Sequence, residues 1–160
     1  MRIAIIGTGA MGSLFAALLS TVADVVMVGT WAEQLRTVHR QGLRLERLDG
    51  DISRHTIVAT SRAKDAWPAD VALLLVKSWQ TGAAAGRARE SLAPSGLAIT
   101  LQNGLGNLET IAAHLGSARA VQGVTSEGAT LLGPGEVRHA GRGHTYLAAE
   151  GTTLGRLETT

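Results

Sequence analysis

Apolar residues along this chain gather in short continuous runs, separated by longer segments with helical spacing. Residues 3–6 and 71–76 are uninterrupted runs typical of strands buried on both faces of a parallel sheet. Residues 24–29 and 97–101 resemble them, and an apolar, proline-free segment that suits a buried helix follows the first run. Because strands and helices alternate, the pattern predicts an α/β domain, doubly wound around a parallel sheet with helices on both faces.

The rest of the chain predicts further helices and a less regular end. Three more segments have helical spacing, at residues 32–41, 77–92 and 108–115. Residues 43–48 alternate apolar and charged positions, and a turn at Asp49-Gly50 leads into a strand over residues 52–59. The last third holds short strands between glycine turns, at residues 120–132, 136–139 and 145–148. We expect these last strands to extend the main sheet in the antiparallel direction.

A glycine-rich turn joins the first strand to the helix that follows it. The turn has the spacing Gly7-x-Gly9-x-x-Gly12. In a strand–turn–helix unit the first glycine permits the tight turn, the second lets the backbone approach a pyrophosphate, and the third allows close packing of the helix. The free N–H groups at the helix start then face the phosphates. We therefore predict a dinucleotide site in a Rossmann-like fold, with a purely structural glycine turn as the alternative.

Composition narrows the class of protein. The chain has 160 residues, 45% hydrophobic and 18% charged, which is typical of one globular domain. A net charge of +2 and scattered arginines favour a solvated surface over a nucleic-acid-binding one. Without cysteine there is neither a disulfide framework nor a thiolate metal site. No apolar run could cross a membrane and the start does not resemble a signal peptide, so we expect a cytoplasmic protein that binds neither nucleic acid nor membrane.

Two polar residues follow neighbouring strands at the predicted carboxyl edge of the sheet. Lys77 comes directly after the run at residues 71–76, and Asn103 follows residues 97–101. Ligands of open α/β sheets bind at this edge, and the start of a helix is electrostatically unfavourable for a cation. We therefore favour a functional Lys77 over a merely solvated one. Asn103 fits a binding role and an ordinary Asn-Gly turn equally well.

The residues after the second strand leave the choice of cofactor open. An acidic residue there would hold the ribose 2′-hydroxyl of NAD, and an arginine would accommodate the 2′-phosphate of NADP. Thr30 and Trp31 supply neither, and Glu33 and Arg36 come a turn or more later. Trp31 could stack on an adenine, although packing is the commoner role of such a tryptophan.

Other titratable residues give weaker signals. The five histidines show no metal-ligand spacing, so no metal site is predicted. The carboxylates form no pair suited to acid–base catalysis, and Ser126-Glu127 is at best a ligand-side pair.

Five segments of the chain, in this order and at these spacings, resemble the 2-dehydropantoate 2-reductase (ketopantoate reductase) family. They read GTGAMGS (7–13), LLLVKSWQT (73–81), LQNGLGN (101–107), QGVTSEGAT (122–130) and GEVRHAGRG (135–143). Members of this family use NADPH to reduce 2-dehydropantoate to pantoate, on the route to pantothenate and coenzyme A. The resemblance implies an oxidoreductase, with NADP as cofactor (NAD as the alternative) and a small-molecule 2-oxo acid as substrate.

The resemblance also implies roles for individual residues. The cofactor-binding residues would be Gly7, Thr8, Gly9, Ala10, Met11, Gly12, Thr30, Lys77, Asn103 and Ala129. Lys77 and Asn103 would also line the substrate end of the cleft, with Gln80 supporting Lys77, and Ala129 would touch the cofactor through its backbone. Thr30 stands where the family commonly has an arginine for the 2′-phosphate, which puts strict NADP preference in question unless Arg36 takes that role.

Family members are considerably longer, with a helical second domain that supplies a general-acid lysine and most substrate contacts. We therefore expect residues 1–160 to be the dinucleotide-binding domain alone, as a fragment or a natural short form. It would have no catalytic residue of its own, with the general-acid lysine beyond Thr160. A homodimer is left open. Two other functions remain as alternatives: a non-catalytic NAD(P)-sensing module, and a related reductase for a different 2-oxo acid.

Overall fold

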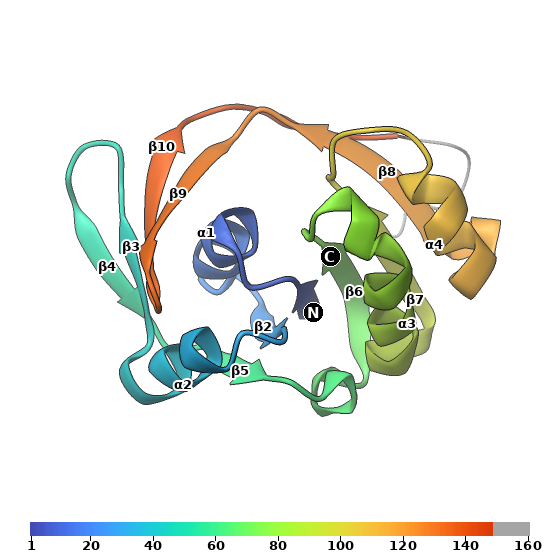
Figure 1. Ribbon diagram of the computed structural model, residues 1–160, viewed down its shortest axis with the longest axis horizontal. Helices are drawn as coiled ribbons and strands as arrows, with labels where there is room; N and C mark the ends of the chain where they lie inside the picture. Colours follow the sequence, from blue (N-terminus) through green and yellow to red (C-terminus); the bar gives the residue numbers. More distant parts are fainter. Residues whose placement is uncertain (149–160) are drawn as a thin grey trace.

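A seven-stranded sheet forms the centre of the computed structural model, which describes residues 1–148 (Figure 1). The strand order is β11-β8-β7-β6-β1-β2-β5, and every pair is parallel except β11 with β8. The strands are β1 (Arg2–Ile6), β2 (Asp24–Val28), β5 (Val58–Thr60), β6 (Ala69–Leu74), β7 (Leu92–Thr100), β8 (Ala120–Thr125) and β11 (Thr145–Leu147). The chain runs outward from β1 to β2 and β5, then returns to β6 on the other side of β1. The topological switch point, where open α/β sheets bind ligands, therefore lies between β1 and β6.

A second sheet of four strands lies on the far side of helix α1 (Ala10–Leu19). Its order is β4-β3-β10-β9, from strands β3 (Leu43–Glu46), β4 (Ile52–His55), β9 (Gly128–Gly133) and β10 (Glu136–Gly141). Helix α1 contacts β1 and β2 of the first sheet and β3, β9 and β10 of the second, so it is enclosed between them (Figure 1). This enclosure explains why its sequence is apolar without a polar stripe, because a helix covered on all sides has no solvent face.

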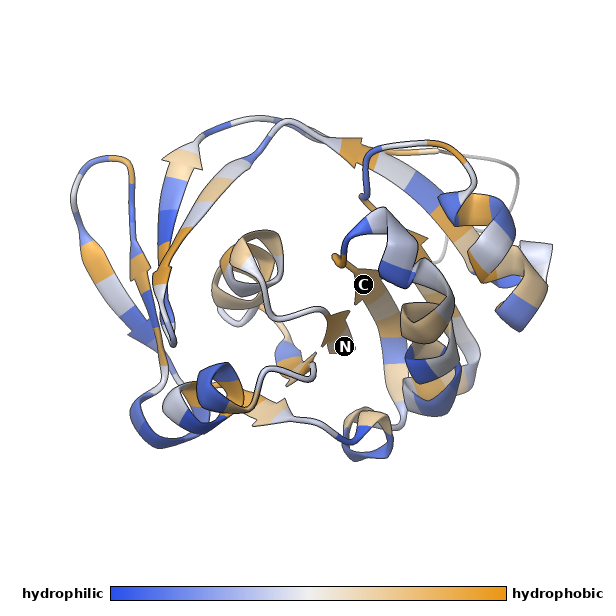
Figure 2. Ribbon diagram, in the orientation of Figure 1, coloured by the Kyte–Doolittle hydropathy of each residue, from blue (hydrophilic) through white to orange (hydrophobic). Residues whose placement is uncertain are grey.

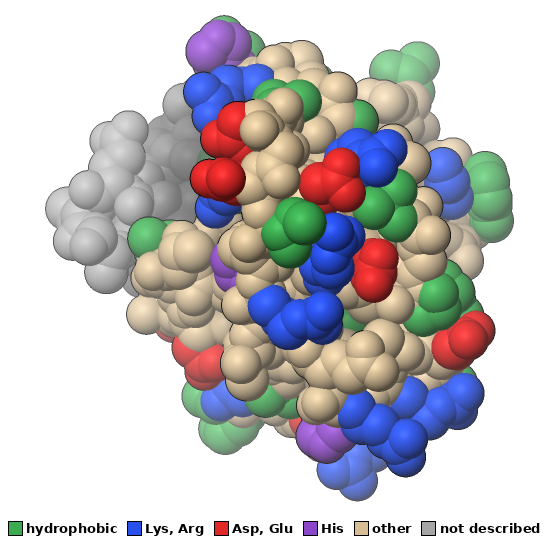
Figure 3. Space-filling model, turned by 90° about the vertical axis from the view of Figure 1, so that its left-hand side faces the viewer, with side chains coloured by type: hydrophobic (Ala, Val, Ile, Leu, Met, Phe, Trp, Pro, Cys, Tyr) green, Lys and Arg blue, Asp and Glu red, His purple; other side chains and the backbone are tan. Residues whose placement is uncertain are grey.

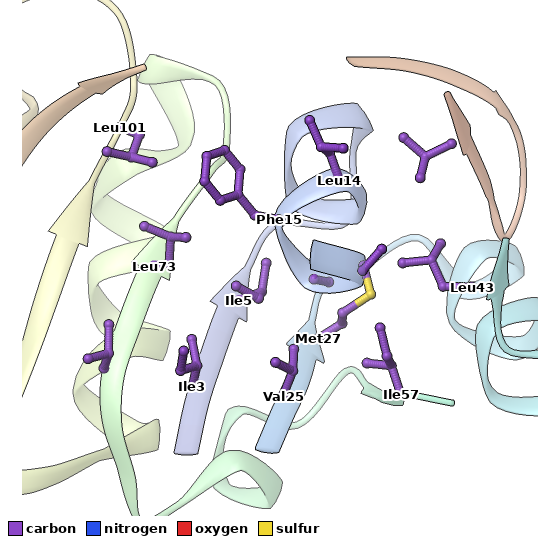
Figure 4. Packing of buried hydrophobic residues seen from close by; sticks show 14 of the residues in the cluster. Ile3, Ile5, Leu14, Phe15, Val25, Met27, Leu43, Ile57, Leu73 and Leu101 are labelled. Carbon is purple, nitrogen blue, oxygen red and sulfur yellow. The ribbon is translucent and has the colours of Figure 1, made fainter. Parts of the chain in front are cut away.

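The larger core cluster fills the layer around α1. Phe15 of this helix points toward Leu73 and Leu101 above the main sheet, and Ile5 of β1 lies beneath the helix (Figure 4). Leu43 of β3 belongs to the same cluster, so the two sheets share one core. Burying each large aliphatic or aromatic side chain contributes about 1.5–3 kcal/mol of transfer free energy, which makes this layer the main source of stability.

The opposite face of the main sheet is covered by α3 (Thr81–Ser91) and α4 (Asn107–Leu115). Ala84, Ala85 and Ala88 form the buried side of α3, and these small side chains let the helix backbone approach the strands closely. Figure 2 shows the apolar strands inside and polar residues on the outer surface of α3. Helix α2 (Ala32–Gln41) packs beside β5 and adds Val38 to the core around α1.

The doubly wound α/β fold predicted from the sequence is confirmed, with helices on both faces of a largely parallel sheet. Two predictions about its strands are wrong. Residues 52–59 do not form one strand, because the chain passes from the second sheet (β4) to the main sheet (β5) near Thr56. Of the strands in the last third, β8 and β11 belong to the main sheet, and only β11 runs antiparallel to its neighbour there. Strands β9 and β10 join β3 in the second sheet, where they cover the apolar surface of α1.

Several element boundaries also differ from those expected. Helix α1 begins at Ala10, inside the glycine motif, rather than after it. The helix expected from residue 77 starts as a 3-10 turn, η2 (Ser78–Gln80), before α3. Strand β7 begins at Leu92 and so includes Pro94, with irregular pairing to β6 near Ala69. Two further 3-10 turns, η1 (Ala63–Ala66) and η3 (Ser117–Arg119), complete the described elements.

The outer face of the second sheet carries paired charges. Arg138 Nε lies 2.7 Å from Glu46 Oε1, and Arg44 bridges Glu46 and Glu136 at 3.7 and 3.5 Å. Figure 3 shows basic and acidic side chains interleaved on this side of the molecule. The hydrogen bond from Arg138 is the main reason that the pKa of Glu46 is lowered. Among residues 1–148, no helix is long and apolar enough to cross a membrane.

Candidate nucleotide-binding site

A cleft of about 650 Å³ opens at the switch point between β1 and β6. It is lined by the β1–α1 turn, by the segments that follow β2, β6 and β7, and by the first half of α3. These segments meet because the carboxyl ends of parallel strands share one edge of the sheet. The cleft is therefore where the topology places a ligand.

The β1–α1 turn depends on two glycines for its shape. Gly7 has a φ of +124°, and a β-carbon there would lie 2.8 Å from the carbonyl oxygen of Leu75. Its N–H donates to the carbonyl oxygen of Val28 at 2.9 Å, which fixes the turn to β2. A β-carbon on Gly12 would overlap the backbone carbonyl of Gly7. Only glycine at both positions lets α1 start directly above the end of β1.

The start of α1 is open to the cleft. Gly9 is the N-cap residue, and a β-carbon there would meet no atom within 4 Å. No side chain caps the helix and no acidic residue lies in its first turn. The N–H groups of Ala10, Met11 and Gly12 therefore have no partner within the helix, and the positive end of its dipole is not neutralised. This arrangement suits a phosphate group.

The end of β2 forms one wall of the cleft without contributing a charge. Gly29 is buried, and a β-carbon there would collide with the side chain of Thr8. Thr30 and Trp31 follow it and line the cleft, and Trp31 keeps 38% of its surface exposed. Arg36, the residue considered for a 2′-phosphate, is exposed on α2 and is not part of the lining.

Lys77 and Asn103 both lie at the carboxyl edge, after β6 and β7 respectively, and both line the cleft. No salt bridge among residues 1–148 involves Lys77, so its ammonium group is available to a ligand. Gln80 Oε1 accepts a long hydrogen bond from the backbone N–H of Lys77, at 3.4 Å. Gln80 therefore holds the Lys77 backbone rather than its side chain.

A buried hydrogen-bond network fixes the floor beneath Asn103. Gln102 Nε2 donates to the carbonyl of Val76 at 2.8 Å and to Thr81 Oγ1 at 3.0 Å, and its Oε1 accepts from Thr100 Oγ1 at 2.9 Å. Asn107 Nδ2 donates to the carbonyl of Asn103 at 3.2 Å. The network joins the ends of β6 and β7 to the starts of α3 and α4, which makes the Lys77 and Asn103 positions rigid relative to each other.

Eight of the ten residues expected to bind the cofactor line this cleft; Gly12 and Ala129 do not. Gly12 acts through packing, and Ala129 lies on β9 opposite His139, packed against the core around α1. Arg87 and Trp79, which were not among the residues expected from the sequence, also line the cleft. Trp79 could have been found from its position two residues after Lys77, just past the same strand, whereas the place of Arg87 depends on how α3 is rotated on the sheet.

The Ser126-Glu127 segment has a structural role. Glu127 Oε2 lies 2.5 Å from His139 Nε2, and both side chains are largely buried. The N–H of His144 donates to Ser126 Oγ at 3.0 Å. These contacts tie the β8–β9 connection to β10 and to the segment before β11. Residues 1–148 contain no group of three potential metal ligands.

Comparison with known proteins identifies the family. The family model described as Ketopantoate reductase PanE/ApbA matches residues 3–151. This chain belongs to the ketopantoate reductase family. The 2-dehydropantoate 2-reductase of Halobacterium salinarum is 38% identical over 150 residues, covering 92% of this chain and 48% of the relative. That of Archaeoglobus fulgidus is 34% identical over 159 residues, covering 98% and 50%. The chain thus spans about half the length of these relatives.

Solved structures of the family agree with the fold. A PanE/ApbA family ketopantoate reductase from Ralstonia eutropha superposes with a TM-score of 0.85 at 31% identity, over 92% of this chain and 49% of that one. D-mandelate dehydrogenase, in a complex with NADH and anilino(oxo)acetate, gives a TM-score of 0.89 at 25% identity, over 99% and 52%. All of these proteins are reductases or dehydrogenases by name, which favours an oxidoreductase over a non-catalytic sensing module.

Proposed function

We propose that this chain is the nucleotide-binding part of an NADPH-dependent reductase that converts 2-dehydropantoate to pantoate. The observation that carries the proposal is the cleft itself, which combines an uncapped helix N-terminus with Lys77 and Asn103 along the same edge of the sheet. The relatives named 2-dehydropantoate 2-reductase support the choice of substrate.

The residues of the cleft fit a dinucleotide. Its pyrophosphate would lie against the free N–H groups of α1, in the space left beside Gly9. Bound there, NADPH supplies a hydride to the substrate carbonyl. Lys77 and Asn103 would lie at the nicotinamide end, where an ammonium group and an amide can orient the carboxylate and carbonyl oxygens of a 2-oxo acid. The cleft residues bind and orient both reactants.

Reduction of a ketone also needs a proton donor for the developing alkoxide. In this proposal that group is a lysine supplied by the part of the relatives that this chain does not span. We therefore expect the 160-residue chain to bind NADPH and to reduce 2-dehydropantoate far more slowly than a full-length relative.

The proposal is tested by titrating the folded chain with NADPH and NADH, following nicotinamide fluorescence or the heat of binding. Binding of NADPH with a Kd in the micromolar range is the expected result. If the folded chain binds neither cofactor at millimolar concentration, the proposal fails. Turnover of 2-dehydropantoate at the rate of a full-length relative would contradict the assignment of the proton donor.

The similarity to D-mandelate dehydrogenase supports a second candidate, a reductase for another 2-oxo acid. The two candidates share the cofactor and differ in the substrate.

A further inference from the structure

The cleft carries an unbalanced positive charge. Two of its lining residues are charged, Lys77 and Arg87, and both are cations. No Asp or Glu belongs to the lining, so nothing there matches the acidic residue that holds the ribose 2′-hydroxyl in NAD-dependent enzymes. The electrostatics of this site therefore suit a ligand with more negative charge than NAD.

Arg87 is half-buried on α3, and no partner among residues 1–148 explains its position. No salt bridge or side-chain hydrogen bond among residues 1–148 includes its guanidinium group. Holding an arginine side chain at a partly buried place costs side-chain entropy and hydration. Such a cost is offset where the guanidinium binds an anion, since its planar fork pairs with phosphate oxygens through two parallel hydrogen bonds.

The geometry of α3 directs Arg87 toward the β2 side of the cleft. Gln80, Ala83, Ala84 and Arg87 follow one another at helical spacing, and all line the cleft. The other edge of α3 faces α4, because Thr81 is hydrogen-bonded to Asn107 there. Helical side chains lean toward the helix N-terminus, and the alanines before Arg87 leave room for its long side chain to reach the carboxyl edge.

The positively charged groups of the cleft lie in different parts of it. The free N–H groups of α1 serve the pyrophosphate, and Lys77 lies at the β6–β7 end with Asn103. The edge of α3 that carries Arg87 lies away from α4 and faces η1, which contacts β2. Thr30 and Trp31, the residues that follow β2, line the same cleft. In Rossmann folds this is where the adenosine ribose lies, and where an arginine accommodates the 2′-phosphate of NADP.

We infer that Arg87 binds the 2′-phosphate of NADPH and sets the preference for NADPH over NADH, from α3 rather than from the segment after β2. The inference rests on the proposed function and names a specificity residue within the same site. If Arg87 binds the phosphate, no charged residue is needed directly after β2, which agrees with the uncharged Thr30 at that place. Arg36 then has no role in cofactor selection.

The test compares the affinities of NADPH, NADH and adenosine 2′,5′-bisphosphate for the wild-type chain, Arg87→Gln and Arg89→Gln. Arg89 is an exposed arginine on the same helix, outside the cleft, and serves as the matched control. Loss of a charge-assisted hydrogen bond to phosphate weakens binding by roughly ten- to a hundredfold. We expect that loss for NADPH and the bisphosphate with R87Q, a change of less than about threefold for NADH, and no change with R89Q.

Equal losses of NADPH and NADH affinity with R87Q would overturn the inference, because they would place Arg87 at a group that both cofactors share. An unchanged NADPH affinity would do the same. A wild-type chain that binds neither cofactor refutes the proposed function itself, so the two failures are distinct. NADH binding by R87Q reports that the variant is folded. Should R87Q not fold, Arg87→Lys carries the test, with a smaller loss for NADPH alone, since lysine keeps the charge but not the fork.

Discussion

The carbonyl oxygen of Gly7 occupies the place where a β-carbon on Gly12 would have to lie. The first turn of α1 therefore rests directly on the end of β1, with no room for a side chain between them. Gly12→Ala must push the helix away from the strand, and α1 has little freedom to move because it is enclosed by two sheets. We expect the free energy of unfolding to fall by about 1–3 kcal/mol, measured by urea denaturation. A variant as stable as wild type would show that α1 can shift.

Gly9 offers the contrasting substitution in the same turn. A methyl group on Gly9 meets no protein atom within 4 Å, so Gly9→Ala should cost no more than about 1 kcal/mol as an N-cap change. The methyl group would occupy space that a pyrophosphate needs, and we expect NADPH affinity to fall roughly tenfold or more. Gly82→Ala, on α3 with equally open surroundings, is the control and should bind NADPH normally. Normal binding by G9A would place the pyrophosphate elsewhere.

The two lysines of the chain allow an internal comparison. Lys77 lines the cleft, whereas Lys64 is exposed on η1 outside it. A cofactor at about ten times its Kd leaves roughly a tenth of the sites free, so it should slow acylation of Lys77 by an amine-reactive reagent roughly tenfold. Acylation of Lys64 should be unchanged. Peptide mass spectrometry gives both rates from one sample, and equal rates with and without NADPH at Lys77 would remove it from the site.

The buried side chain of Gln102 joins the segment after β6 to α3 and to the end of β7. Gln102→Leu keeps the volume approximately but leaves the Val76 carbonyl and the hydroxyl groups of Thr81 and Thr100 without this partner. Unsatisfied buried polar groups cost about 1–3 kcal/mol each, so we expect a loss of at least about 2 kcal/mol. Gln41→Leu, at the exposed end of α2, should change stability by less than about 0.5 kcal/mol. If Q102L lost no more stability than this control, the hydrogen-bond network would contribute little to the free energy of unfolding.

The stability of the fold should depend on pH through His55. Burial is the main cause that lowers the pKa of His55, with a smaller contribution from Arg47, and the ring lies 2.9 Å from the hydroxyl groups of both Ser20 and Ser53. The folded state therefore favours the neutral ring, while the unfolded chain takes up a proton near pH 6.5. The contribution of His55 to the free energy of unfolding is therefore present above about pH 6.5. It is lost as the pH falls through the lowered pKa of the folded state.

The measurement is urea unfolding of wild type and His55→Gln between about pH 7 and pH 5. The stability difference between the two should shrink toward the lower pH. A difference that stays constant with pH would contradict the assignment to His55.

Local signals explain which parts of this structure could be predicted from the sequence. The β1–α1 unit was predictable because the apolar run, the glycine spacing and the helix lie within twenty consecutive residues. The change of sheet near Thr56 was not, because no glycine or proline marks it and both halves of residues 52–59 have strand-like composition. The pairing of β3 with β10 depends on what covers α1, which is a property of the assembled core.

The same distinction holds for the site. Gly7 to Met11, Lys77 and Asn103 follow from their positions after strands, since parallel strands bring their carboxyl ends together. Arg87 comes from the middle of a helix with little amphipathic pattern, so its place in the cleft depends on how α3 is rotated on the sheet. In the folded structure, α3 buries its alanines against the sheet and joins α4 through the Thr81–Asn107 hydrogen bond.

The enclosure of α1 between two sheets has a consequence for the order of folding. The second sheet closes through contacts between distant parts of the chain, such as the hydrogen bond from the N–H of Arg44 to the carbonyl oxygen of Gly135, at 2.8 Å. Until β10 has left the ribosome, one apolar side of α1 has no cover. The helix that would anchor the cofactor is thus synthesised well before β9 and β10, the strands that complete its cover, and a nascent chain stalled before Val137 would expose it to aggregation or to chaperones.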